Sequence, residues 1–338
     1  MIGNPPYQED SVGDSTHNMP IYHLFMDAAF EVADQAVLIT RPLGSCSTLV
    51  TRPRAWNEKM LADPHLSVPI YVRDSSDLFP GTKIRAGIVV THRDASRDGT
   101  PIGTFTAFQQ LNSILHKVVE SKYEPLETLG LTTGRSYRYT DQMHEEHPDA
   151  TKLLSDGHKY VIGPYAFRRL PFLYTPAKPS DSYEYVQVLG RDANRRVCRW
   201  IRSDYVTGPD SLHNYKVAIP AANELNKLGW MAAPLVLGPR VAVTQTFLTI
   251  GAFKTEQEAQ ACFSYIKTKF ARLMLYVLKV TQHNPRSTWR YVPAQDFTSA
   301  SDIDWSKSIP EIVAQLYAKY GLDAEEIAFI EAEVTPME

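Results

Sequence analysis

Residues 22–40, with the sequence YHLFMDAAFEVADQAVLIT, decide the fold class that we expect for the chain. Apolar side chains recur at helical spacing over residues 22–32, and a short apolar run follows at residues 36–40. Outward from this segment, residues 84–91 form another strand-like run and residues 107–119 another amphipathic helix. Because alternating helices and strands are typical of α/β proteins, we predict an α/β fold.

The amino-acid composition changes after about residue 120, where proline, tyrosine and arginine become frequent. Residues 183–189 and 241–250 are predicted strands, and one long helix is predicted from Thr255 to about Val280. Two short helices are predicted in the acidic tail, the second capped by Asp323. We therefore expect three parts, covering residues 1–120, 121–300 and 301–338.

Composition places the chain among ordinary globular proteins. It has 338 residues, of which 43% are hydrophobic and 22% charged. No run approaches the ~18 apolar residues of a membrane span, and the N-terminus lacks the pattern of a signal peptide, so we expect a cytoplasmic protein. Cys46, Cys198 and Cys262 form no C-x-x-C pair. They indicate buried thiols and neither a disulfide framework nor a zinc site.

Charge is distributed unevenly along the chain, although the formal net charge is only −3. Residues 151–300 carry 20 Lys and Arg against 10 Asp and Glu, whereas residues 1–150 carry 13 against 19 and residues 301–338 carry 2 against 9. A phosphate-binding surface needs a local excess of Lys and Arg, so this basic region between acidic flanks indicates such a surface. A solvated face is the alternative interpretation.

The tetrapeptide Asn4-Pro5-Pro6-Tyr7 is the most specific motif in the chain. From average residue usage, a chain of this length would contain it by chance on the order of once in a thousand. The alternative interpretation is a frayed, proline-containing terminus over residues 1–18. The same four residues form the signature of adenine-specific (N6) DNA methyltransferases, and the chain resembles the target-recognition half of such an enzyme from a bacterial restriction–modification system.

The resemblance implies a chemical role for each motif residue. The side-chain oxygen of Asn4 and the carbonyl of Pro5 would each accept one N–H of the adenine amino group, and the Pro5-Pro6 pair would stiffen the loop. Tyr7 would stack on a flipped adenine. We expect the motif in a loop at the carboxyl end of a parallel strand that ends at residues 2–3.

Further segments extend the resemblance along the chain. Residues 20–27 and 37–42 are similar to the next helix and strand of the family, and residues 78–90 to its strand pair beside the flipped base. There Phe79 would supply the second stacking face, the alternative being an ordinary core aromatic. Segments that resemble the C-terminal part of large methylases, including fused methylase–endonucleases, are residues 281–283, 290–297, 316–322 and 325–331. The resemblance implies a partial Rossmann-like methyltransferase sheet, an α+β target-recognition domain over residues 121–300 and a short helical tail.

Basic residues suited to double-stranded DNA lie in the predicted recognition domain. The candidates are Arg191, Arg195, Arg196, Arg199 and Arg202, which cluster beside Trp200, and Lys267 and Lys269 on the long helix. A basic strand edge that resists aggregation is the competing interpretation of the arginines.

The resemblance also names a cofactor that the chain accommodates only in part. The family uses S-adenosyl-L-methionine, whose glycine-rich loop precedes the catalytic motif, and only Met1-Ile2-Gly3 precedes Asn4 in this sequence. We therefore expect a fragment, a truncated product, or a subunit whose partner chain carries the missing half, and one that is inactive alone.

Two other functions compete with methylation. One is a DNA-recognition module without methyl transfer. The other is part of a restriction endonuclease, for which the sequence offers only Glu120-Ser-Lys122 with Asp98 upstream, and exposed helix-end charge explains these residues as well. No metal site is expected, since His144, His147 and His158 lie in a polar loop without ligand spacing.

Overall fold

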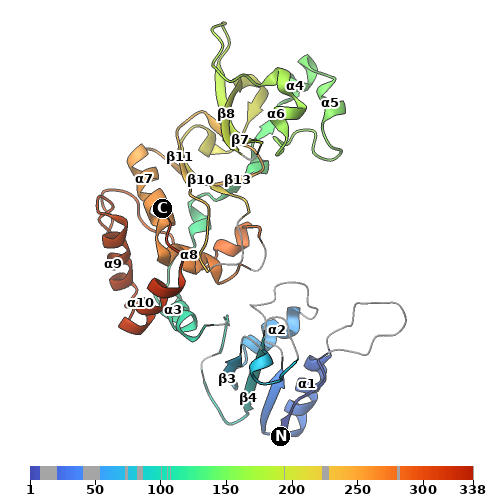
Figure 1. The fold of residues 1–338 in the computed structure, drawn as a ribbon, viewed down its shortest axis with the longest axis vertical. Coiled ribbons are helices and arrows are strands. Elements are labelled where there is room, and N and C mark those ends of the chain that lie inside the picture. The colour runs from blue at the N-terminus through green and yellow to red at the C-terminus, as the bar shows by residue number, and fades with distance from the viewer. Residues whose placement is uncertain are drawn as a thin grey trace. The chain divides into compact units, whose positions relative to one another are not determined.

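The computed structural model describes residues 1–7, 21–40, 54–72, 75–81, 87–99, 101–104, 106, 108–193, 195–222, 228–279 and 282–337. The chain forms two compact units, Met1–Ser113 and Ile114–Glu338. Both combine helices with sheets, which confirms the α/β fold class (Figure 1). Of the quoted segments, residues 8–18, 20, 41–42, 82–86, 107, 280–281 and 338 and Cys46 lie outside the described residues.

The first unit is built on a four-stranded sheet with the order β1-β2-β4-β3. Strand β1 (Ile2–Gly3) pairs in parallel with β2 (Gln35–Thr40), so that Ile2 lies opposite Val37. Strand β4 (Ile88–Asp94) runs antiparallel to both β2 and β3 (Leu66–Val72). The predicted strand at residues 36–40 is confirmed, and β1 lies at an edge of the described sheet.

Helices α1 (Tyr22–Val32) and α2 (Arg54–Leu61) pack with this sheet around one apolar core. The predicted helix over residues 22–32 is confirmed, because its apolar residues recur every three to four positions and Tyr22, Met26 and Ala29 are buried. The core contains Tyr22, Met26, Ala29, Ala36, Leu38, Trp56, Met60 and Leu66. A 3-10 turn, η2 (Ser75–Asp77), precedes β4.

The second unit contains two larger sheets and one small one. The first has the order β11-β10-β13-β5 and consists of β5 (Thr132–Thr133), β10 (Tyr215–Pro220), β11 (Leu235–Leu237) and β13 (Phe247–Phe253). The second has the order β12-β7-β8 and consists of β7 (Tyr185–Asp192), β8 (Arg195–Arg202) and β12 (Val241–Val243). Strands β6 (Arg138–Tyr139) and β9 (Val206–Thr207) pair with each other.

The prediction of a single strand over residues 241–250 is wrong. The segment forms β12, which pairs with β7, and then β13, which pairs with β10. A turn separates them, in which the Phe247 N–H donates to the Thr244 carbonyl at 3.1 Å. The apolar run is continuous in sequence because both strands are buried, so periodicity alone could not reveal the turn.

Helices surround these sheets. Helix α3 (Gln109–Glu120) crosses the boundary between the units, and α4 (Asp141–Glu146), α5 (Ala150–Leu153) and α6 (Ala166–Arg169) lie in the second unit. The remaining helices are α7 (Glu256–Lys267), α8 (Lys269–Tyr276), α9 (Ile309–Lys319) and α10 (Ala324–Glu333). The 3-10 turns of this unit are η3 (Leu126–Leu129), η4 (Gly134–Ser136), η5 (Pro171–Leu173), η6 (Ser203–Tyr205), η7 (Asp210–Leu212) and η8 (Arg286–Trp289).

The long helix predicted from Thr255 is two helices in the structure. Thr268 interrupts it with extended backbone angles, and its buried hydroxyl accepts from the Ala271 N–H at 3.1 Å and donates to the Tyr265 carbonyl at 2.7 Å. The Thr268 hydroxyl thus hydrogen-bonds to the end of α7 and to the start of α8. Because these bonds compete with the backbone hydrogen bonds of a continuous helix, the chain turns at this residue.

Residues 301–338, expected as a separate tail, lie within the second unit. Both predicted helices are present, and their capping boxes join Ser308 to Glu311 and Asp323 to Glu326. Ile312, Leu316 and Ile330 are buried because α9 packs against α7 and α8, and α10 against α8. Glu326 of α10 is also buried, whereas the other acidic residues of these two integrated helices are exposed.

Candidate functional site

The segment Asn4–Tyr7 forms the loop that directly follows β1. Because β1 is parallel to β2, this loop leaves the sheet at the carboxyl end of a parallel strand, where open α/β sheets place their ligands. Asn4 is exposed, and the Tyr7 carbonyl accepts from the Ile21 N–H at 3.2 Å. The expected strand at residues 2–3 is confirmed, and the amide of Asn4 is accessible to a ligand.

The two predicted stacking residues occupy different settings in the first unit. Tyr7 is half-buried and packs against the core formed by α1, α2 and the sheet. Phe79, also half-buried, lies in the turn after η2, where its N–H donates to the Ser75 carbonyl at 2.8 Å. Stacking on a base stays a prediction for both rings.

The residues described around Asn4–Tyr7 do not form a complete S-adenosylmethionine site. Ile2 is 87% exposed on the edge strand that carries the loop, so no described element covers this part of the strand. The 338 residues also contain no G-x-G pattern that could approach a cofactor closely. The residues present therefore do not fit the cofactor by themselves, and no chemical step is derived through it.

Five predicted DNA-contacting arginines lie on the hairpin of β7 and β8, which we call the β7–β8 ribbon (Tyr185–Asp192 and Arg195–Arg202). The far end of its two strands projects beyond the neighbouring helices α4 and α6 in Figure 1. Arg191 lies opposite Arg196, and Asp192 lies opposite Arg195. Arg191 and Arg195 are exposed and Arg196 is half-buried. Arg191 and Arg196 therefore share one face at the end of the ribbon, whereas Arg195, opposite Asp192, lies on the other face.

The like charges of Arg191 and Arg196 face each other across the ladder. Directly opposed like charges destabilise a strand pair. Partial burial and the charge of Arg191 lower the pKa of Arg196. Arg191, Arg195 and Arg196 form no ion pair with any residue that the structure describes. The ribbon end is therefore a cationic surface that would be stabilised by an anion.

Arg202, at the other end of the same strand, is engaged within the protein. Its guanidinium donates to the Glu146 carboxylate at 2.7 Å and to the Tyr205 hydroxyl at 2.8 Å, and it also pairs with Asp204. The Tyr183 ring lies 3.9 Å from it. Hydrogen bonds from Tyr205, Gln142 and Arg202 lower the pKa of Glu146 to about 2. Arg202 thus anchors α4 to the ribbon, a role that the sequence prediction missed, although Asp204 two residues later was an available signal.

Arg199 is less exposed than Arg195 and less closely paired with a carboxylate than Arg202. Its guanidinium lies 3.6 Å from the Asp192 carboxylate, and its side chain is 29% exposed. Trp200, the aromatic neighbour noted in the sequence, is half-buried and bridges to Thr175.

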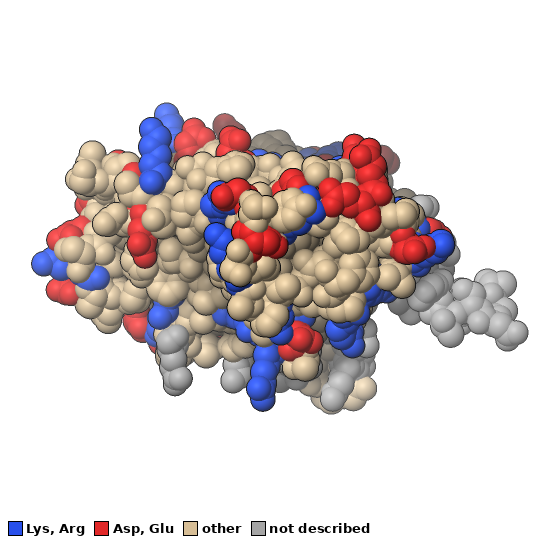
Figure 2. Space-filling model, turned by 90° about the horizontal axis from the view of Figure 1, so that it is seen from above, with Lys and Arg blue, Asp and Glu red and all other residues tan. Residues whose placement is uncertain are grey.

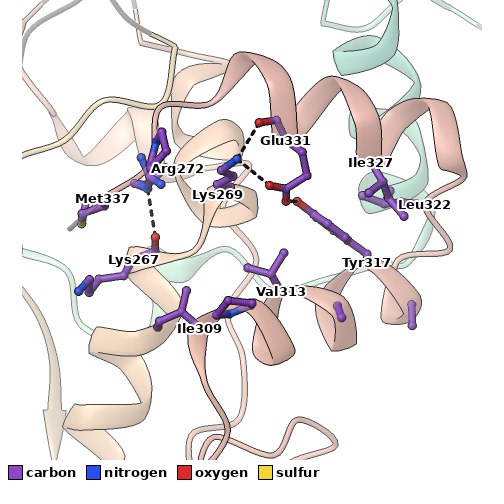
Figure 3. A pocket seen from close by; sticks show the side chains of 14 residues that line it. Lys267, Lys269, Arg272, Ile309, Val313, Tyr317, Leu322, Ile327, Glu331 and Met337 are labelled. Carbon is purple, nitrogen blue, oxygen red and sulfur yellow. Dashed lines mark hydrogen bonds and ion pairs between the residues drawn. The ribbon is translucent and has the colours of Figure 1, made fainter.

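Lys267 and Lys269 line a pocket among α8, α9 and α10 (Figure 3). Lys269 donates to the Glu331 carboxylate at 2.6 Å and to the Glu331 carbonyl at 2.7 Å. Lys267 lies 5.5 Å from the centre of the Phe263 ring. Arg272, which the prediction for DNA contact did not include, lines the same pocket.

Lys and Arg do not form one continuous patch on the face seen in Figure 2. Lys and Arg are interspersed there with Asp and Glu. On this face the overall charge excess is therefore a weaker guide to a DNA-binding surface than the local cluster at the end of the ribbon.

Other titratable residues have structural partners. His144 contacts the Lys159 carbonyl through Nε2 at 3.0 Å, and His147 contacts the Tyr205 hydroxyl at 3.2 Å. Within the described ranges, no group of His, Cys, Asp and Glu could hold a metal ion. Cys262 is buried as expected, whereas Cys198 is exposed on β8, so the expectation of a buried thiol is wrong there. None of the described helices has the length and apolarity required to cross a bilayer.

Comparison with known proteins gives distant structural neighbours, among them MmeI and BpuSI. No protein-family model and no curated protein matches the chain. The type IIL restriction-modification enzyme MmeI in complex with DNA is 10% identical with a TM-score of 0.38, and the match covers 98% of this chain and 56% of that one. The type IIG restriction endonuclease BpuSI is 11% identical with a TM-score of 0.35, over 93% of this chain and 48% of that one. The chain thus spans about half the length of each, and similarity at this level establishes neither a family nor a function.

Proposed function

We propose that this chain carries the catalytic loop and the DNA-contacting part of an S-adenosylmethionine-dependent, adenine-N6-specific DNA methyltransferase of a bacterial restriction–modification system. The observation that carries the proposal is the position of Asn4-Pro5-Pro6-Tyr7, directly after a strand that is parallel to its neighbour, with Asn4 exposed. Double-stranded DNA with a flipped adenine is the substrate, and the bacterial cytoplasm is the compartment.

The chemistry of the loop follows from its residue types. An adenine amino group is a poor nucleophile because its lone pair is delocalised into the ring. When the Asn4 side-chain oxygen and the Pro5 carbonyl each accept one N–H, the nitrogen becomes more tetrahedral and its lone pair is less delocalised into the ring, which would make it a better nucleophile. The proline pair supports this geometry because it fixes φ and removes two competing donors.

The cofactor would be supplied mainly from outside the described residues. S-adenosylmethionine provides the electrophilic methyl group in this reaction. We propose that a glycine-rich segment, on the same polypeptide or on a partner chain, binds it beside the loop that follows β1. The exposed edge of β1 is where such a segment could add to the sheet.

The β7–β8 ribbon is proposed to contact the DNA. A two-stranded ribbon fits the major groove, and arginine binds both phosphates and guanine edges. Arg191, Arg195 and Arg196 are suited to this role because no described carboxylate engages them. Arg199 and Arg202 would support the ribbon from within, since both already pair with carboxylates.

Methyl transfer to DNA tests the proposal. The complete gene product, incubated with radiolabelled S-adenosylmethionine and duplex DNA, is expected to produce N6-methyladenine, and Asn4→Ala is expected to reduce the rate at least about a hundredfold. Asn214→Ala, which changes another amide outside the motif, is the control and should retain the rate. Undiminished transfer by Asn4→Ala would exclude a catalytic role for the loop.

A DNA-recognition module without methylation is the second candidate. Arg191, Arg195 and Arg196, which form no ion pair with a described residue, favour it. It predicts duplex binding that weakens with salt, with no S-adenosylmethionine binding detectable by calorimetry in the complete gene product. Binding of the cofactor at micromolar concentration would decide for the methyltransferase.

A further inference from the structure

The pocket among α8, α9 and α10 is a concave site of a size and lining unlike an exposed DNA-contacting surface. Its volume is about 780 Å³, within the range of sites that hold small organic molecules. Ile309, Val313, Tyr317, Leu322 and Ile327 supply apolar walls. Figure 3 shows these side chains arranged around the same space as Lys267, Lys269 and Glu331. The pocket therefore offers an apolar surface with charged groups at defined positions.

Arg272 is the unusual member of this lining. It is only 3% exposed, and its Nη1 donates to the carbonyls of Gly229 at 2.8 Å and Thr335 at 2.6 Å. Its Nε donates to the Lys267 carbonyl at 3.2 Å. Within the part of the chain that the structure describes, Nη2 has no acceptor and the guanidinium has no carboxylate partner. A buried charge of this kind is normally paired, because removing it from water is costly.

The neighbouring charges do not neutralise Arg272. Among the described residues of the lining, Glu331 is the one with a carboxylate, and Lys269 already pairs with it at 2.6 Å. Tyr317 also donates to Glu331, at 2.8 Å. Lys267 pairs with no described carboxylate and contacts only the Phe263 ring. Three cations and one anion therefore leave the lining with two excess positive charges.

We propose that this pocket binds an amphipathic organic anion, a carboxylate or phosphate head group on an apolar body. The head group would receive hydrogen bonds from Arg272 Nη2 and the Lys267 ammonium, since a guanidinium and an ammonium both bind such oxyanions strongly. The apolar body would contact Val313, Tyr317 and Ile327 and exclude water from them. This site does not include Asn4–Tyr7 or the β7–β8 ribbon, although Lys267 and Lys269 are also candidate DNA contacts.

Ligand titration tests the site with four probes. The fluorescent anion 8-anilinonaphthalene-1-sulfonate, which has an aromatic body, is expected to bind the complete folded protein and to be displaced by octanoate. Octan-1-ol, which lacks the charge, and acetate, which lacks the apolar body, are each expected to displace it at least about tenfold more weakly. Equal displacement by octan-1-ol, or no binding of the dye, would overturn the proposal.

Variants locate the binding within the pocket. Lys267→Met is expected to weaken octanoate binding about fivefold or more, because it removes a charged hydrogen-bond donor. Lys152→Met removes the same charge from an exposed side chain elsewhere in the unit and should leave binding unchanged. Ala314→Trp places a large ring at an exposed lining position and should abolish binding while the circular dichroism spectrum stays native. Retained octanoate binding in Ala314→Trp, or a Lys267→Met variant that loses DNA affinity but keeps octanoate affinity, would contradict the site.

Discussion

At the scale of single residues, the arginines of the β7–β8 ribbon differ in what their charge does. Arg202 is 14% exposed and holds Glu146 and Asp204, whereas Arg195 is exposed and pairs with no described carboxylate. The same residue type, seven positions apart on one strand, is thus a structural cross-link at one end and a free cation at the other. We therefore expect Arg202 to contribute to the stability of the fold and Arg195 to be available for ligand binding.

Arg202→Met is expected to lower the free energy of unfolding by about 1–2 kcal/mol, because it leaves Glu146 and the Tyr205 hydroxyl without their shared donor. Arg195→Met should change it by less than about 0.5 kcal/mol, as for most exposed substitutions. Urea denaturation of both variants measures the difference. Equal stability of the two proteins would show that the Arg202 network contributes nothing.

Lys216 on β10 is a buried lysine whose protonation is linked to folding. The side chain is fully buried, its Nζ donates to the carbonyls of Asn214 at 3.1 Å and Gly238 at 2.9 Å, and burial lowers its pKa to about 7. Between this value and the ordinary lysine pKa of 10.5, the unfolded chain binds more protons than the folded one. Lys216 therefore makes the folded state more stable as pH rises through this window.

Lys216→Met should reduce the gain in unfolding free energy between about pH 7 and pH 10, because it removes the group that releases the proton on folding. Chemical denaturation at both pH values measures this gain. Lys307→Met, at a half-exposed position, is the control and should keep the wild-type dependence. An unchanged pH dependence in Lys216→Met would mean that Lys216 stays charged in the folded protein.

At the scale of elements, Thr268 decides where one predicted helix becomes two. Its hydroxyl has partners on both sides of the break and is fully buried. Thr268→Val keeps the shape of the side chain but leaves the Ala271 N–H and the Tyr265 carbonyl without this partner, so the unfolding free energy should fall by about 2 kcal/mol.

Thr255→Val is the matched control for this prediction. Thr255 caps α7 in the same way, by accepting from the Glu258 N–H at 3.2 Å, but it is exposed, so water replaces the lost hydroxyl. Its cost should be about 1 kcal/mol or less. Thermal and urea unfolding of the pair compare the two caps, and a larger loss in Thr255→Val would contradict the role assigned to Thr268.

The elements that could be predicted from sequence are those whose signals are local. Apolar periodicity predicts helix α1 with its observed bounds, and the capping residues Asp323 and Glu326 predict α10. The turn between β12 and β13 could not be predicted, because which sheet each strand joins depends on partners far away in the sequence. The pairing of Arg202 with Glu146 spans 56 positions and was hidden for the same reason. The motif Asn4–Tyr7 is recognisable because its specificity lies in four adjacent residues.

At the scale of the whole molecule, net charge conceals the part that is proposed to bind DNA. The formal charge of −3 gives no general attraction to a polyanion. Binding must therefore come from a local arrangement. The end of the β7–β8 ribbon offers Arg191 and Arg196 on one face and Arg195 on the other, and none of the three forms an ion pair with a described carboxylate. If these three residues supply the phosphate contacts, the salt dependence of binding should be small and should depend on them.

The slope of log K against log salt concentration for duplex DNA depends on the number of phosphate contacts. Each phosphate contact adds about 0.9 to the slope of log K against log salt concentration, because it releases counterions. Replacing Arg191, Arg195 and Arg196 by methionine should therefore reduce the slope by about 2–3 and weaken binding most strongly at low salt. Lys152→Met combined with Lys307→Met, which removes exposed lysines of surface ion pairs, should leave the slope within about 0.5 of the wild-type value, since neither residue is assigned a phosphate. Fluorescence anisotropy of a labelled duplex between about 50 and 200 mM salt measures the slopes. If the triple variant kept the wild-type slope, the DNA would be bound by another surface, and the unpaired arginines of the ribbon would have to serve a different anion.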